Sequence, residues 1–178
     1  MFSFETLNID LKAMTEDSKE FDIMLTDEYF QGLDDAEIEH GSVNAKVSIR
    51  KVPSGEFTLT LSVKGIVTVE CDLCLDDMEQ PIENEASFAV KLGETPSEDD
   101  QLIVVDENQG ILALSWIIYE TIVLAIPIKH VHAPGKCNDA MTQKLMELSA
   151  TRSGDEEQPA DNDNGAIDPR WAKLKELM

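Results

Sequence analysis

Apolar side chains recur at every second position through much of residues 42–92, and this alternation restricts the fold more than any other feature of the chain. A period of two is typical of strands that bury one face and expose the other. The turn sequence Pro-Ser-Gly at 53–55 separates the first two runs and predicts a β-hairpin over 42–63. A third strand is expected over 82–92. The alternating apolar residues are Val43, Ala45, Val47, Ile49, Phe57, Leu59, Leu61, Val63, Ala86, Phe88, Val90 and Leu92.

Shorter patterns flank this region. Apolar alternation predicts two strands, one over 7–11 and one over 21–25, and residues 29–33 are expected to form a helical turn. After Gly65 the apolar positions no longer keep one phase, and a β-bulge at this glycine would explain the shift. A short apolar strand is expected over 102–105.

A run of 16 residues, 111–126, is almost wholly apolar. It is shorter than the roughly 20 residues that a membrane-spanning helix needs, it contains Glu120, and Pro127 follows it. The sequence therefore predicts one long helix buried in a core, and a further short helix over 139–148. These patterns together predict an α+β fold, in which antiparallel β-hairpins, as an open sheet or a partial barrel, pack around the long helix.

The composition changes near the C-terminus and predicts three parts. Residues 1–152 are expected to form a single α+β domain. Residues 153–168 are rich in acids and poor in apolar residues, which predicts an acidic flexible linker. Residues 169–178 are predicted to form a C-terminal amphipathic helix, because Asp168 is a good N-cap and Pro169 suits the first helical position.

The charge balance limits the partners of the chain. It has 36 Asp and Glu against 14 Lys and Arg, a formal net charge of −22. Such a surface repels nucleic-acid phosphates and anionic lipids, so we expect no membrane partner and no broad electrostatic docking on RNA. Basic proteins remain suitable partners. The first residues lack a charged leader and an apolar signal core, and three cysteines do not make a disulfide framework, so a cytoplasmic protein is expected.

Two cysteines three positions apart, Cys71 and Cys74, form the sharpest local motif. They occupy the expected connection between two strands, where such spacing can hold one zinc ion from one side. A structural site needs two further ligands, and the candidates are Cys137 with His132 or His130, which share one irregular segment after the apolar run. The sequence thus predicts a Cys3His zinc site.

Two other interpretations of the cysteines remain open. Buried cysteines can act simply as small apolar residues. A redox dithiol is disfavoured, because Asp72, Asp76 and Asp77 surround the pair and favour the protonated thiol. The histidines and serines form no recognisable nucleophile arrangement, so we expect no enzymatic activity and no small-molecule substrate.

Basic residues are few but concentrated in two places. Lys129 and Lys136 fall in the segment that contains Cys137, and Arg170 and Lys173 flank Trp171 in the predicted terminal helix. These are the candidate contacts for a partner or for RNA. The alternative is that they balance nearby acids, which the net charge favours.

Three segments also form an ordered set of motifs: residues 65–75 (GIVTVECDLCL), residues 124–130 (LAIPIKH) followed by Cys137, and residues 168–177 (DPRWAKLKEL). The first resembles a strand followed by CxRCL, the second a helix end with a hydrophobic-Pro pair, a His and a late Cys, and the third the ending DPRxAxLKxL. In this order they resemble the bacterial YceD family of large ribosomal RNA subunit accumulation proteins, over residues 42–178.

This resemblance implies a non-enzymatic factor needed for accumulation of 23S ribosomal RNA and for biogenesis of the large ribosomal subunit. It also implies metal binding and nucleic-acid binding. The sequence departs from the family at Asp72-Leu73, where a basic residue usually precedes the second cysteine, and this weakens the RNA-binding inference. The residues that match the family motifs are Cys71, Cys74, His130, Cys137, Asp168, Pro169, Arg170 and Lys173.

Two functional hypotheses follow. In the first, the chain is a ribosome-assembly adaptor whose acidic surface binds a basic ribosomal protein or assembly factor. In the second, it is a small zinc-binding structural module that contacts ribosomal RNA directly through Lys129, Lys136 and the terminal helix.

Overall fold

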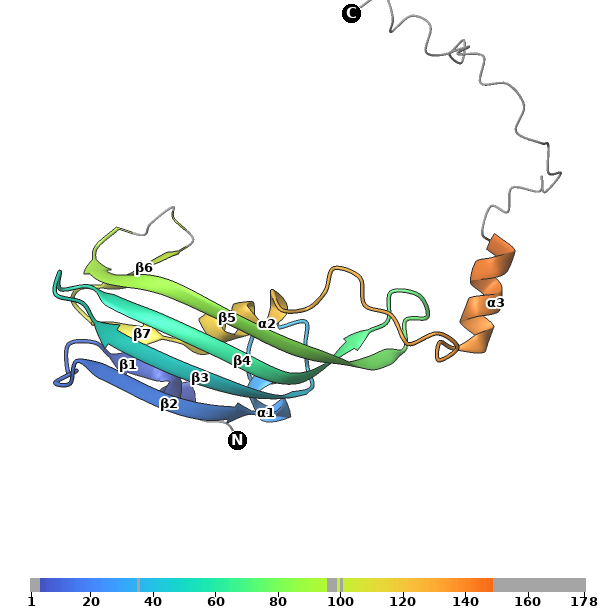
Figure 1. Cartoon of the computed structure of the whole chain (residues 1–178), viewed down its shortest axis with the longest axis horizontal. Coiled ribbons are helices and arrows are strands. Elements are labelled where there is room, and N and C mark those ends of the chain that lie inside the picture. Colours follow the sequence, from blue (N-terminus) through green and yellow to red (C-terminus); the bar gives the residue numbers. More distant parts are fainter. Residues whose placement is uncertain (1–3, 35, 96–98, 100, 149–178) are drawn as a thin grey trace, which may run out of the picture. The chain divides into compact units, whose positions relative to one another are not determined.

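A five-stranded sheet dominates the computed structural model, which describes residues 4–34, 36–95, 99 and 101–148 (Figure 1). Its strands follow the order β2-β3-β4-β5-β6. From β2 to β5 each strand runs antiparallel to its neighbour, whereas β6 runs parallel to the end of β5. The strands are β2 (Ser18–Leu25), β3 (Gly41–Lys51), β4 (Phe57–Glu70), β5 (Asp77–Gly93) and β6 (Leu102–Asp106). The α+β prediction is confirmed. The sequence left an open sheet and a partial barrel as alternatives, and the sheet is open.

The alternating apolar residues of β3 and β4 form the core face of this sheet. Val43, Ala45, Val47 and Ile49 are fully buried, and each lies opposite a residue of the same face in β4. Burial of one valine or isoleucine side chain of this set contributes about 1.5–3 kcal/mol to folding. The period-two pattern therefore identified both the hairpin and its buried face correctly.

Gly65 lies within an unbroken ladder, so the prediction of a β-bulge there is wrong. It is opposite Val43 on β3 and Ile82 on β5, and the register on either side of it is continuous. A Cβ at this position would collide with the backbone of Ser42 and Val43. The glycine lets β3 approach β4 closely, and the buried phase resumes at Val67. A missing side chain, not an extra residue, interrupts the apolar pattern.

The predicted long buried helix is also wrong. Residues 111–126 divide into β7 (Ile111–Ala113) and the nine-residue helix α2 (Ser115–Val123). Strand β7 pairs antiparallel with β1 (Asn8–Asp10), and these two strands form a separate small sheet. An apolar run alone does not distinguish a strand from a buried helix, because both bury apolar side chains. Pro127 helps to end the helical region, since a proline disfavours the α conformation in the residue before it.

Helix α2 packs against β4 and β5 and is held by polar contacts as well as apolar ones. Its buried residues include Ile118, Tyr119 and Ile122. The Tyr119 hydroxyl accepts hydrogen bonds from the backbone N–H of Glu37 at 2.8 Å and of Ile38 at 3.3 Å. This places the segment before β3 beside the middle of α2.

The remaining helices are short: η1 (Phe4–Leu7), α1 (Asp27–Phe30) and α3 (Asp139–Leu148). The contacts divide the chain into two units, Met1–Gln143 and Lys144–Met178. Among the described residues no helix is both long and apolar enough to cross a membrane. The predicted acidic linker and C-terminal helix lie outside the described residues.

Candidate metal centre

The turn between β4 and β5 carries the first two cysteines. Cys71 follows directly after β4, and its N–H donates to the Asp76 carbonyl at 2.9 Å. The Leu75 N–H donates back to the Cys71 carbonyl at 2.9 Å, which closes a tight turn around Cys74. Leu75 has a φ of 61°, a left-handed conformation that only a minority of residues with a side chain adopt. This turn presents both thiols toward the same side.

The loop after α2, residues 127–138, is fastened to this turn at both of its ends. The Asp72 N–H donates to the His130 carbonyl at 3.0 Å, and the His130 N–H donates to the Asp72 carboxylate at 2.7 Å. At the other end the Asn138 side-chain amide donates to the Asp76 carboxylate at 3.2 Å. These backbone and side-chain bonds bring two distant parts of the sequence into one site.

Four potential metal ligands meet where turn and loop join: Cys71, Cys74, His132 and Cys137, here called the Cys3His cluster. Their ligand atoms all lie within 4.8 Å of one another. The sulfur atoms of Cys71 and Cys137 are 3.9 Å apart, and the Cys74 sulfur is 3.3 Å from His132 Nδ1. A tetrahedral zinc ion with Zn–S bonds of about 2.3 Å would place two sulfur ligands about 3.8 Å apart. The donor set and its spacing therefore suit a structural zinc site.

The thiols have unequal acidities. Burial of Cys71 opposes ionisation, but hydrogen bonds from the backbone of Cys74, His132 and Leu73 outweigh it and lower the Cys71 pKa to about 6. Burial raises the pKa of Cys137 to about 11, and the neighbouring Cys71 and Cys74 reinforce the shift. Crowded thiols resist ionising together unless a cation compensates their charge. This is the electrostatic environment that a divalent cation would stabilise.

His130 lies outside the cluster, although the sequence made both His130 and His132 candidates for the fourth ligand. Its Nδ1–H donates to the Pro127 carbonyl at 3.0 Å, and its Nε2 is 3.7 Å from the Asp72 carboxylate. His130 thus fastens the loop to the cysteine turn, while His132 presents its ring to the thiols. Periodicity could not separate the two, because the loop has no regular structure.

Three supporting residues, Asp72, Asp76 and Asn138, were not predicted as part of the site. From the sequence, the acids near the cysteines favour protonated thiols and disfavour a redox role. In the structure Asp72 and Asp76 instead hold the loop in place. Of the predicted basic contacts, Lys129 and Lys136 are exposed on this loop. Arg170, Trp171 and Lys173 lie outside the described residues.

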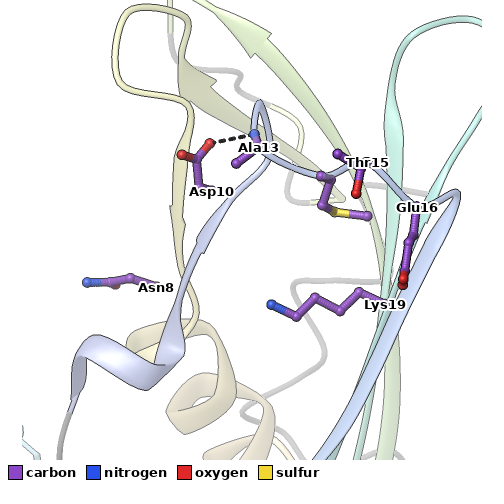
Figure 2. A pocket seen from close by; sticks show the side chains of 7 residues that line it. Asn8, Asp10, Ala13, Thr15, Glu16 and Lys19 are labelled. Carbon is purple, nitrogen blue, oxygen red and sulfur yellow. Dashed lines mark hydrogen bonds between the residues drawn. The ribbon is translucent and has the colours of Figure 1, made fainter.

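A hollow elsewhere in the chain, near β1 and the start of β2, has no such grouping of ligands (Figure 2). In this hollow the Asp10 carboxylate accepts hydrogen bonds from the N–H groups of Lys12 at 2.9 Å and Ala13 at 3.0 Å. Asp10 therefore shapes the turn that follows β1. The residues with metal-binding chemistry gather at the cysteine turn instead.

The fold and the site define a class: an α+β protein in which a CxxC turn between two strands meets a late Cys and His. A model of the family described as large ribosomal RNA subunit accumulation protein YceD matches residues 59–178. The match covers well over half of the chain, from β4 onward, and the chain belongs to the YceD family. The comparisons with curated proteins and with solved structures gave no match.

Proposed function

We propose that this chain is a non-enzymatic factor that supports 23S ribosomal RNA accumulation and large-subunit biogenesis by binding a basic protein partner. The observation that carries the proposal is membership of the YceD family, whose description names a role in large ribosomal RNA subunit accumulation. The net charge of −22 supports a protein partner rich in lysine and arginine.

In this proposal one zinc ion is held by Cys71, Cys74, His132 and Cys137 and acts structurally. Four protein ligands would close the coordination sphere, which is typical of structural rather than catalytic zinc. The ion would join the cysteine turn of β4 and β5 to the loop 127–138. It would therefore stabilise the surface that surrounds both segments.

A second candidate is direct RNA contact by the same zinc module. The observation that favours it is the exposure of Lys129 and Lys136 on the loop that carries His132 and Cys137. The nearby carboxylates of Asp72 and Asp76 oppose it, because they repel phosphate at the same place. Substitution of both lysines by Glu separates the candidates: direct RNA binding would be lost, whereas the adaptor would keep its basic partner.

The test of the proposed function is genetic complementation. In cells that lack the gene, we expect the mature 23S ribosomal RNA to fall relative to 16S, and the full-length chain to restore it. A chain with Cys71→Ser and Cys137→Ser should restore it poorly, whereas Ile111→Thr, an exposed change on β7, should restore it fully. An unchanged 23S level in the cells without the gene would contradict the proposal.

A further inference from the structure

An apolar groove with a cavity volume of about 720 Å³ opens beside the Cys3His cluster. One side is formed by the end of β4 and the cysteine turn, and the other by the residues that follow α2. Its apolar lining includes Ile38, Val69, Leu75, Ile126 and Ile128. The groove lies wholly within the first unit of the chain, 1–143.

Two of these side chains are exposed to an unusual degree for large apolar residues. Leu75 is 62% exposed, and Ile128 is fully exposed. They come from the two segments that the cluster joins, the cysteine turn and the loop after α2. Large exposed apolar surfaces with polar rims are typical of sites that bind another molecule.

The backbone at Leu75 gives a second, independent observation. Its φ of 61° is the left-handed conformation that normally selects glycine, because a Cβ is unfavourable there. The fold thus keeps a leucine where glycine would suit the turn better, and the side chain points mostly into solvent. Residues held in such conformations concentrate at ligand-binding sites.

The rim of the groove is acidic. Glu37, Glu70 and Asp72 all line it and all are exposed. Within the part of the chain that the structure describes, no lysine or arginine lies within ion-pair distance of Glu37 or Glu70. These carboxylates are therefore available to cations from another molecule, and they would repel RNA.

We propose that this groove is a docking surface for a segment of a basic protein, in which an apolar side chain is flanked by lysine or arginine. The apolar side chain contacts Leu75 and Ile128, and the flanking cations pair with Glu37 and Glu70. The inference rests on the proposed function and names the chemistry of its partner. A second copy of this chain is a poorer occupant, because each copy carries a charge of −22.

The test uses the full-length chain and two probes: the proteins extracted by high salt from purified large ribosomal subunits, and the ribosomal RNA that remains. A photo-reactive benzoylphenylalanine replaces Ile128. We expect cross-links to a protein peptide that contains an apolar residue beside lysine or arginine. Cross-links to RNA, or between two copies of the chain, would overturn the proposal.

Substitutions then test the groove with the cross-linked protein as the probe. Leu75→Asn should weaken its binding by about tenfold, as removal of an apolar interface anchor does, because Asn tolerates the left-handed conformation but is polar. Ile111→Thr is the matched control, since Ile111 is an exposed apolar residue on β7. Its binding should equal that of the unchanged chain.

A third variant separates docking from folding. Leu75→Gly suits the backbone of the turn, so its thermal midpoint and metal content should be at least as high as those of the unchanged chain, while binding falls. If Leu75→Asn, Leu75→Gly and the unchanged chain bind the basic protein equally, the groove is not its docking surface. The proposed function would still stand. An unchanged chain that binds no basic ribosomal protein would overturn both.

Discussion

Gly65 shows how one missing side chain sets the spacing of two strands. A Cβ there would meet the backbone of Ser42 and Val43 in β3, and backbone atoms cannot move aside as a flexible side chain can. The close approach of β3 to β4 at this point depends on that space. The position lies opposite Ile82 of β5, so any displacement would affect three strands at once.

Gly65→Ala should therefore lower the free energy of unfolding by about 1–3 kcal/mol, the usual cost of overpacking a well-packed core. Urea denaturation followed by circular dichroism measures the change. Gly93→Ala is the control, because the Cβ added there meets only the tip of the Val104 side chain at 3.2 Å. Equal effects of the two substitutions would contradict the close-approach explanation.

The acidities of Cys71 and Cys137 predict how zinc binding depends on pH. With a pKa of about 6, Cys71 is mostly ionised at pH 7 in the metal-free site, whereas Cys137, with a pKa of about 11, is protonated. A thiol must lose its proton to ligate zinc. Zinc binding at pH 7 should thus release at least one proton, and affinity should fall more steeply below pH 6, where Cys71 is protonated too.

Isothermal titration calorimetry in buffers of different ionisation enthalpy counts these protons. The count should rise between pH 7 and pH 5. A count of zero at pH 7 would contradict the assignment of Cys137 as a protonated ligand. Cys137→Ser should lower both the count and the affinity.

Asp72 supports the cluster without belonging to it. Its carboxylate accepts the His130 N–H, and its own N–H donates to the His130 carbonyl. Asp72→Ala should weaken zinc binding by about tenfold, the lower end of the effect of losing groups that support metal ligands. Asp72→Asn should keep most of the affinity, because its amide oxygen can accept the same N–H. Competition with a chelating dye compares them, and equal affinities would contradict the supporting role.

At the scale of elements, the alternating strands were predictable and the apolar run was not. Strands β3 and β4 followed from a period of two, since burial on one face dictates every second residue. Residues 111–126 lacked such periodicity, and their division into β7 and α2 depends on pairing with β1, which lies about a hundred residues earlier. The parallel pairing of β6 with β5 is likewise set by distant contacts.

The candidate metal site also has features that the sequence predicted and features that it did not. The CxxC turn and its position between two strands were predicted from the sequence, as was the set of candidate ligands. The selection between His130 and His132 was not predictable, because it depends on hydrogen bonds that His130 donates to the Asp72 carboxylate and the Pro127 carbonyl only in the folded chain. Asp72 and Asp76, which disfavoured a redox role for the cysteines, hold the loop against the cysteine turn.

The loop 127–138 has little regular structure, so the cluster should decide how ordered it is. Zinc removal by a chelator should raise hydrogen exchange at the amides of residues 129–137 and leave those of β3 unchanged. The reason is that the cluster joins this loop to the cysteine turn, whereas β3 is held by ladder bonds on both sides. Unaltered exchange in the loop would show that its hydrogen bonds suffice without a metal.

Two properties of the whole chain, its acidity and its membership of the YceD family, support the proposed function. A charge of −22 on 178 residues makes a basic partner favourable and an exposed phosphate backbone unfavourable. The match to the YceD family begins within β4 and covers the cysteine turn, the cluster and the groove residues from Thr68 onward, whereas Glu37 and Ile38 of the groove precede it. The cluster and the groove share the two segments, the cysteine turn and the loop after α2, so a zinc ion in the first would also fix the shape of the second.

The most direct test of this account is the zinc content of the full-length, untagged protein, measured by elemental mass spectrometry. We expect about one zinc per chain in the unchanged protein, as a closed four-ligand site requires. Cys71→Ser and Cys137→Ser should each lose it, and His130→Gln should retain it. Absence of zinc from the unchanged protein, or its loss from His130→Gln but not from His132→Gln, would contradict the assigned site.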